Sequence, residues 1–349
     1  MSAINAEDII NATGLTNYDI GILDRPNMPR FLDIVRDALS GQLDLTPMGL
    51  LNSFTGVIFA EFAANGMLIR QLVVVAILGA LMSVLTEAFL HKQASEAGFY
   101  VTFLMAAALA ISSFYIAVDV LNRLITLVSG IMLASVPLMI GLLAMGGNFV
   151  GAAGLNSLLF LALQLLARFI THVFVPLVLA STALDIAGKL SADGAKLDKL
   201  AELVRNIASW TLKGLLALFA FLLTLQRITA PVVSNLALRT GRNVVGAVPV
   251  VGNAFTAAVD TIVNFSQAAR SGVLVALVLV LCATIAGPLI KIFVLGFIYK
   301  LVAAFLQPVA DKRLVELMSS VGKHLAMLFN AAALVGILCI YAVVVVLSF

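Results

Sequence analysis

Two ionisable side chains, Arg168 and His172, stand inside the apolar stretch LQLLARFITHVFVPL. Because they lie four residues apart, a helix places them on one face. A charge at mid-bilayer costs at least about 2.5–3.5 kcal/mol on insertion scales, so this face should point toward protein or water rather than lipid. Two interpretations stay open. The pair lines a polar path, or the arginine bonds to neighbouring carbonyls for purely structural reasons.

Further ionisable residues interrupt other apolar runs. Lys291 lies near the middle of the run 272–306, whereas Lys300 is close enough to the end of that run to reach the headgroups. Asp119 and Arg123 repeat the four-residue spacing at the end of another run, where a solvated loop pair is the simpler interpretation. The predicted polar seam or gate consists of Arg168, His172, Lys291, Asp260 and Arg227.

The sequence offers no recognisable catalytic or metal site. It contains no HExxH, GxSxG or GxxxxGK[ST] motif. Its three histidines lack ligand spacing, and Cys282 and Cys339 have no CxxC partner. We therefore predict a protein that is not an enzyme and that uses no metal or cofactor.

The composition indicates that the chain is surrounded by lipid rather than by water. Hydrophobic residues make up 62% of its 349 residues and charged residues 11%, against about 45–50% and 25% in soluble domains. Such a chain cannot cover itself with polar surface, so we predict an all-α polytopic transmembrane helix bundle. The net charge of +3 and the absence of a basic block argue against nucleic-acid binding.

The elements follow from the apolar runs, since a span needs about 20 such residues. We expect a polar N-terminal segment (1–46) with a short amphipathic helix, an interfacial helix (47–70) and a transmembrane domain (71–349). About seven spans are predicted: 71–90, 99–118, 124–145, 157–181, 210–226, 272–306 as one or two, and 325–347. Two amphipathic helices, 193–210 and 312–323, would lie between spans, with Asp311 capping the second. Each is either a surface helix at the headgroups or a docking helix for a partner protein.

Residues 227–271 form the least regular segment. Pro249 and Gly252 break its most apolar stretch, and Asp260 places a charge in the second half. Non-helical backbone survives at membrane depth only where protein or a water-filled cavity satisfies it. We predict a broken hairpin, either re-entrant on the pore side or packed at the interface. Its predicted breaks are Pro231, Pro249, Gly252 and Asn253.

A glycine-rich stretch, AMGGNFVGAAGLN, lies between two expected spans. Gly147 and Gly151 have the GxxxG spacing that lets membrane helices approach closely. A tight turn between spans explains the same residues.

Two long stretches resemble a known family. LQRITAPVVSNLALRTGRNVVGAVPVVGNAFTAAVDTIV and GPLIKIFVLGFIYKLVAAFLQPVADKRLVELMSSVGK are similar to the signature regions of stage III sporulation protein AE. The order and spacing agree across about 205–349, and the earlier spans are collinear. Family members commonly begin with a signal peptide and a longer exported region, and neither is visible here.

The resemblance implies a function and partners. It implies an integral protein of the mother-cell (outer forespore) membrane, in a channel or secretion-like complex needed for late forespore development. The implied partners are the ring-forming AG and AH proteins, the ATPase-like AA protein and the small membrane members, together with the lipid bilayer and further copies of the chain. This protein would be the permease-like member. The alternatives are a membrane scaffold without its own pore and a standalone secondary transporter.

Overall fold

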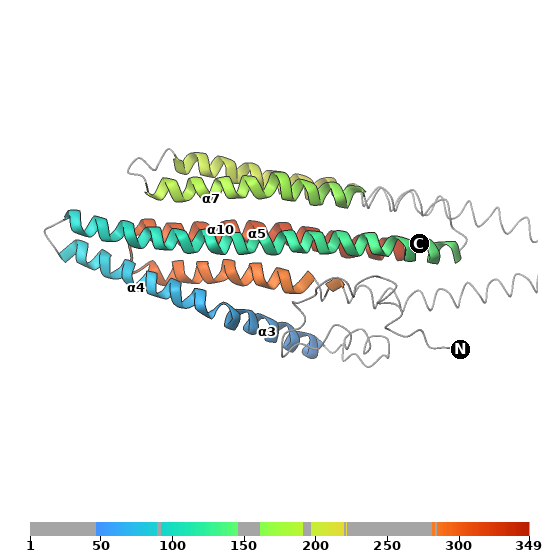
Figure 1. The fold of residues 1–349 in the computed structure, drawn as a ribbon, viewed down its shortest axis with the longest axis horizontal. Helices are drawn as coiled ribbons and strands as arrows, with labels where there is room; N and C mark the ends of the chain where they lie inside the picture. The colour runs from blue at the N-terminus through green and yellow to red at the C-terminus, as the bar shows by residue number, and fades with distance from the viewer. Residues whose placement is uncertain are drawn as a thin grey trace, which may run out of the picture.

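The described part of the chain is a bundle of helices. In the computed structural model it comprises residues 47–88, 92–145, 161–190, 197–219, 221, 281–282 and 285–348. Within these ranges no strand occurs, and short turns at residue 65 and over 307–311 each join two consecutive helices. Figure 1 shows the helices side by side, with their long axes roughly aligned. The predicted all-α fold is confirmed for this part of the chain.

The described chain begins with two helices, α3 (Pro47–Ala64) and α4 (Gly66–Ala88). Their apolar stretches, Thr55–Ala64 and Gly66–Met82, are bent by 59° relative to each other. Asn65 stands at the bend, where its side-chain nitrogen donates to the backbone oxygen of Glu61 at 2.8 Å. The Asn-Gly sequence favours a break because both residues are poor helix formers. We expected the first span to begin after residue 70, whereas the break falls at residue 65.

The next helix, α5 (Lys92–Met145), has 54 residues and is about 81 Å long at 1.5 Å per residue. We expected two spans here, 99–118 and 124–145, separated by a turn. The helix instead continues unbroken, because the stretch from Asp119 to Arg123 contains neither glycine nor proline. These two side chains form an ion pair along the helix, with 2.9 Å between Nε and Oδ2.

A long helix, Leu161–Leu190, contains the expected span 157–181 only in part and extends past its end. Its middle is a π turn, η2 (Ile170–Phe174), followed by α7 (Val175–Leu190). The backbone N–H of Val175 donates to the oxygen of Ile170, one residue further back than in an α-helix. Pro176 explains the π turn, because proline has no N–H for the regular bond and its ring crowds the preceding turn.

Residues 197–219 form one continuous helix that runs beside α7 (Figure 1). We expected an amphipathic helix over 193–210 and a separate span over 210–226. The structure joins them, and large apolar side chains lie exposed on this helix: Leu200, Leu203, Ile207, Trp210, Leu216 and Leu218. This exposed apolar surface suits lipid. The helix runs antiparallel to α7, since Gly188 lies against Asp198 and Asp185 against Arg205.

The last two helices are Ile285–Leu306 and α10 (Lys312–Ser348). The carboxylate Oδ1 of Asp311 accepts the backbone N–H of Arg313 at 2.8 Å, which confirms Asp311 as the N-cap. We expected an amphipathic helix over 312–323 and a separate span over 325–347. They form a single helix, since no residue between them breaks it.

Close packing holds the bundle together. A Cβ atom built on Gly322 would lie 2.8 Å from Cγ of Lys300 and 3.3 Å from the backbone oxygen of Gly296. Only glycine therefore allows α10 to approach the helix Ile285–Leu306 so closely. The buried hydroxyls of Ser113 and Tyr299 are hydrogen-bonded at 2.9 Å, which ties α5 to the same helix.

Four helices among the described residues are long and apolar enough to cross a membrane: Ala97–Gly130, Leu161–Leu190, Ile285–Leu306 and Lys312–Tyr341. The bent pair α3 and α4 would add a fifth if it forms one span. We expected about seven. Part of the difference arises at α5, where two expected spans form one helix, and part of the expected spans lies outside the described residues.

Candidate functional site

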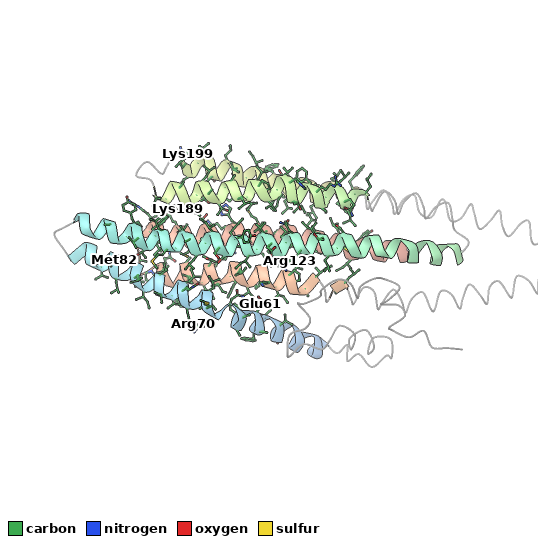
Figure 2. All side chains as sticks on the ribbon, viewed as in Figure 1. Glu61, Arg70, Met82, Arg123, Lys189 and Lys199 are labelled. Carbon is green, nitrogen blue, oxygen red and sulfur yellow. The ribbon has the colours of Figure 1, made fainter. Side chains whose placement is uncertain are left out.

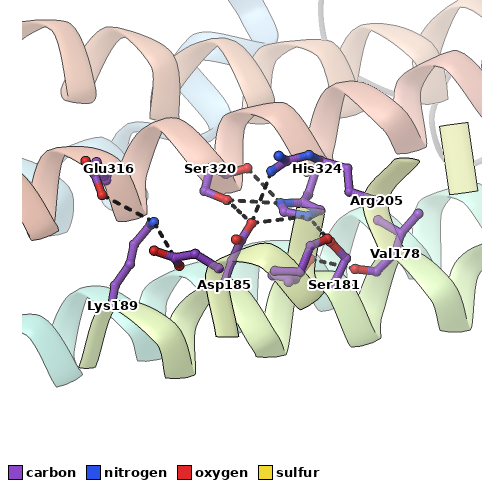
Figure 3. Close-up of polar contacts among 11 residues, drawn as sticks. Val178, Ser181, Asp185, Lys189, Arg205, Glu316, Ser320 and His324 are labelled. Carbon is purple, nitrogen blue, oxygen red and sulfur yellow. Dashed lines mark hydrogen bonds and ion pairs between the residues drawn. The ribbon is translucent and has the colours of Figure 1, made fainter. Parts of the chain in front are cut away.

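Helices α7 and α10 meet along a line of polar residues. On each helix these residues recur every four positions, which places them on one helical face. The two helices are antiparallel, so each later residue of α7 contacts an earlier residue of α10 (Figure 3). We call the three resulting pairs the polar ladder: Ser181 with His324, Asp185 with Ser320, and Lys189 with Glu316.

The inner pair is fully enclosed. Ser181 and His324 are both 0% exposed, and Oγ of Ser181 lies 2.9 Å from Nε2 of His324. The Ser181 hydroxyl also donates to the backbone oxygen of Ala201, at 3.0 Å, on the helix 197–219. The other ring nitrogen, Nδ1, lies 2.8 Å from the backbone oxygen of Ser320. This pair therefore joins three helices.

The middle pair is centred on the carboxylate of Asp185. Its Oδ2 atom accepts a short hydrogen bond from the Ser320 hydroxyl. The same oxygen lies 3.5 Å from Nη1 of Arg205 and 3.6 Å from Nε2 of His324. The Asp185 side chain is 8% exposed and that of Arg205 27%, so the carboxylate is buried between Arg205 and His324 (Figure 3).

The outer pair lies near the end of the bundle. Nζ of Lys189 is 3.4 Å from Oε2 of Glu316 and 3.7 Å from Oδ1 of Asp198. Gly188 allows this approach, because a Cβ atom at that position would stand 2.6 Å from the same oxygen of Asp198. The lysine side chain is only 10% exposed although both of its acidic partners are 44% exposed. The outer pair thus connects the buried ladder to the surface.

The ladder places charges inside an apolar bundle. From Glu316 to His324 it extends eight residues along α10, or about 12 Å. Charged groups within membrane helices are costly, face the bundle interior and mark ion or proton pathways. The ladder combines a carboxylate, an imidazole and hydroxyls within hydrogen-bonding reach. Its chemistry therefore suits holding or passing a proton or a small ion more than covalent catalysis.

The residues singled out from sequence lie elsewhere. Arg168 and His172 share one face, as predicted, but both are exposed on the outside of their helix. Nδ1 of His172 lies 2.9 Å from the backbone oxygen of Arg168. Lys291 is half-buried on the helix Ile285–Leu306. The structure does not include these residues in the ladder, and their predicted role as a seam or gate stays a prediction.

The remaining predicted site residues fall outside the described residues. They are Arg227, Asp260, the predicted breaks Pro231, Pro249, Gly252 and Asn253, and the glycines Gly147 and Gly151. The broken hairpin over 227–271 and the polar segment 1–46 lie there as well.

The ladder was not predicted from the sequence, although its residues form a recognisable pattern there. Serine, aspartate and lysine recur at four-residue spacing in STALDIAGK, and glutamate, serine and histidine do so in ELMSSVGKH. Each series would mark one polar face on a helix that is otherwise apolar. No group of three or more His, Cys, Asp or Glu side chains within the described ranges could hold a metal ion.

Comparison with known proteins identifies the family. The sequence model of stage III sporulation protein AE matches residues 30–349, which is most of the chain. The chain belongs to the stage III sporulation protein AE family. It is 29% identical over 311 residues to stage III sporulation protein AE of Bacillus subtilis (strain 168), covering 89% of this chain and 78% of that protein. No solved structure matches it. A sporulation family and helices capable of crossing a membrane therefore describe the same chain.

Proposed function

We propose that this protein is the membrane-embedded, permease-like component of the complex that links mother cell and forespore, and that it is needed for late forespore development. The family supports a role in sporulation. The polar ladder carries the proposal, because buried charges in an apolar bundle are typical of proteins that move or bind ions and protons. The ladder would line the inner part of the route between α7 and α10.

The proposed setting is the mother-cell (outer forespore) membrane. The proposed partners are the ring-forming AG and AH proteins, the ATPase-like AA protein and the small membrane members of the same operon. Further copies of this chain would also take part. The exposed apolar side chains of the helix 197–219 would contact lipid or these membrane partners.

Basic residues suggest an orientation. Lys189 and Lys199 lie at the same end of the bundle (Figure 2), and Lys312 and Arg313 begin α10 at that end. Short loops rich in lysine and arginine favour the cytoplasmic side of a membrane. We therefore assign this end to the mother-cell cytoplasm, which gives the outer ladder pair access to that compartment.

Sporulation of variants tests the proposal. In the sporulating host, Ser181→Ala and Asp185→Asn should leave a protein that reaches the membrane and co-purifies with its partners but does not support forespore development. Asp119→Asn is the matched control, since it removes a carboxylate from an exposed ion pair on α5, outside the ladder and the predicted seam. Normal sporulation of both ladder variants would contradict a role of the ladder in transport.

The same strains separate the alternatives. A scaffold without its own pore should lose function only when complex assembly is lost. A standalone transporter should give proton or ion flux in liposomes that contain this protein alone. Assembled but inactive ladder variants, together with no flux from the isolated protein, favour the proposed component of a complex.

A further inference from the structure

A second set of charged side chains lies away from the ladder. Its members stand on four helices and, except for the half-buried Asp119 and Lys291, are exposed. Arg123 lies far along the bundle from Lys189 and Lys199 (Figure 2). We call this set the charged belt: Asp119, Arg123, Arg168, His172, Lys213 and Lys291.

Contacts between helices place the belt members of α5 level with Lys291. The hydroxyls of Ser113 and Tyr299 meet at 2.9 Å, and their two helices run in opposite directions (Figure 1). Eight positions along each helix from that pair, Lys291 is level with the midpoint between Asp119 and Arg123.

The same counting along α10 places His172 at nearly that height. The ladder pairs set His172 level with position 333 of α10. The packing of Gly336 sets Lys291 level with position 330. The two heights differ by only about 4.5 Å at 1.5 Å per residue.

The remaining two members complete the belt. Gly188 stands against Asp198, and counting from this contact brings Lys213 to within one residue of the height of His172. Arg168 lies one helical turn beyond His172. The six residues therefore share a layer about 10 Å thick.

The belt carries an excess of positive charge. Four of its members are lysine or arginine and one is aspartate. Guanidinium and ammonium groups bind phosphate oxygens through charge-assisted hydrogen bonds, and basic segments are attracted to anionic lipid surfaces. The exposed members therefore have the chemistry to bind lipid phosphates.

Two exposed aromatic residues border the belt. Trp210, the single tryptophan of the chain, is 75% exposed and precedes Lys213 by three positions. Tyr115 is 74% exposed and lies one turn before Asp119. Tryptophan and tyrosine concentrate where lipid tails meet headgroups. Both residues lie on the side of the belt that faces the ladder, which places the lipid tails on that side.

The distance to the outer ladder pair matches the thickness of a bilayer. From Glu316 to the height of the belt, α10 extends about 21–32 Å, and the hydrocarbon layer is about 30 Å thick. Lys300 and Lys323 are exposed between these heights, and their apolar stems let the amines reach toward the basic end of the bundle. Nε of Arg70 donates to the backbone oxygen of Gly66 at 3.3 Å, toward the end of α4 that is nearer the belt.

We propose that the charged belt lies in the headgroup layer on the side of the membrane opposite the basic end of the bundle, and that its cations bind the phosphates of anionic lipids. The lipid tails then surround the bundle between the belt and the outer ladder pair. The part of α5 that follows Arg123 emerges from them. This inference concerns the isolated protein and does not depend on the proposed function.

Fluorescence quenching in lipid nanodiscs tests the position of the belt. Bromine atoms near the headgroup end of the lipid tails should quench Trp210 more strongly than bromine atoms near the tail ends. The depth control is Ile111→Trp in a chain with Trp210→Phe. Ile111 is 59% exposed, about two turns from Asp119 on the ladder side, so its variant should show the reverse order. Equal or reversed quenching of Trp210, or no quenching of the Ile111 variant, would overturn the proposal.

A comparison of two brominated lipids tests headgroup binding. Brominated phosphatidylglycerol should quench Trp210 as if enriched about fivefold over brominated phosphatidylcholine at the same fraction, which corresponds to about 1 kcal/mol. Arg168→Gln with Lys213→Gln should abolish this enrichment. Lys199→Gln with Lys312→Gln removes the same charge at the other end and should keep it. Equal quenching by both lipids in the parent, or full enrichment in the belt variant, would show that the belt does not bind anionic headgroups.

Discussion

Removing the charge of Asp185 gives the sharpest test of the ladder. Asp185→Asn keeps the shape of the side chain and an oxygen that can accept from Ser320. It removes the negative charge that faces Arg205 at 3.5 Å and His324 at 3.6 Å. Breaking a buried ion pair by neutralising one partner typically costs about 3–5 kcal/mol, because the remaining charge is left without compensation.

The expected cost lies at the lower end of that range. Arg205 is 27% exposed, so part of its charge can relax toward water or headgroups. His324 is fully enclosed, so it gains no contact with water when the carboxylate is neutralised. We therefore expect the free energy of unfolding to fall by about 3 kcal/mol, or roughly 150-fold in the folding equilibrium constant.

This free energy is measured by reversible unfolding in mixed micelles, in which the fraction of a denaturing detergent is raised stepwise. Trp210 is the single tryptophan of the chain and lies on the helix paired with α7, so its fluorescence reports on the relevant element. Asp119→Asn is the control, because its ion pair is exposed and such pairs contribute only about 0.3–0.5 kcal/mol. A loss below about 1 kcal/mol for Asp185→Asn, or an equal loss for the control, would refute the reasoning.

Three further outcomes are expected. Gly322→Val should destabilise the bundle by about 1–3 kcal/mol through overpacking. A Cβ atom at Gly214 would meet no atom within 4 Å, so Gly214→Val should cost less in the same unfolding assay. Tyr299→Phe should cost about 1 kcal/mol, and adding Ser113→Ala should cost little more, because both changes remove one hydrogen bond; a double-mutant cycle with additive losses would contradict this. A single cysteine at position 312, with both native cysteines replaced by serine, should react with an impermeant thiol reagent only after the mother-cell membrane is opened, and labelling of intact cells would reverse the assigned orientation.

Local signals predicted much of the helical structure. The apolar content predicted membrane helices, and an aspartate before an apolar period correctly predicted the cap of α10 at Asp311. Breaks were harder to place. The charged pair Asp119 and Arg123 suggested a loop, but charges four residues apart also stabilise a continuous helix. In α5 the pair lies within one continuous helix, so the two expected spans form a single helix.

The polar ladder could not be predicted from residue spacing within each helix, for a different reason. In water, the polar face of a helix is the exposed one, but in lipid a polar face can turn inward. Arg168 with His172, and Ser181 with Asp185, therefore have the same appearance in sequence, although the first pair is exposed and the second is buried. The contacts that distinguish them join residues far apart in the chain, such as Ser181 and His324, separated by 143 positions.

The length of α5 has a mechanical consequence. A helix of 54 residues measures about 81 Å, and the hydrocarbon layer is about 30 Å thick. Even at a tilt of about 40°, a single crossing uses roughly 39 Å of helix. A single crossing would leave about half of α5 clear of the lipid tails as a stiff rod, with no glycine or proline between Phe99 and Ser129 to bend it. Such a rod would act as a ruler, fixing how far from the membrane a partner at its far end is held and transmitting tilt at one end to displacement at the other.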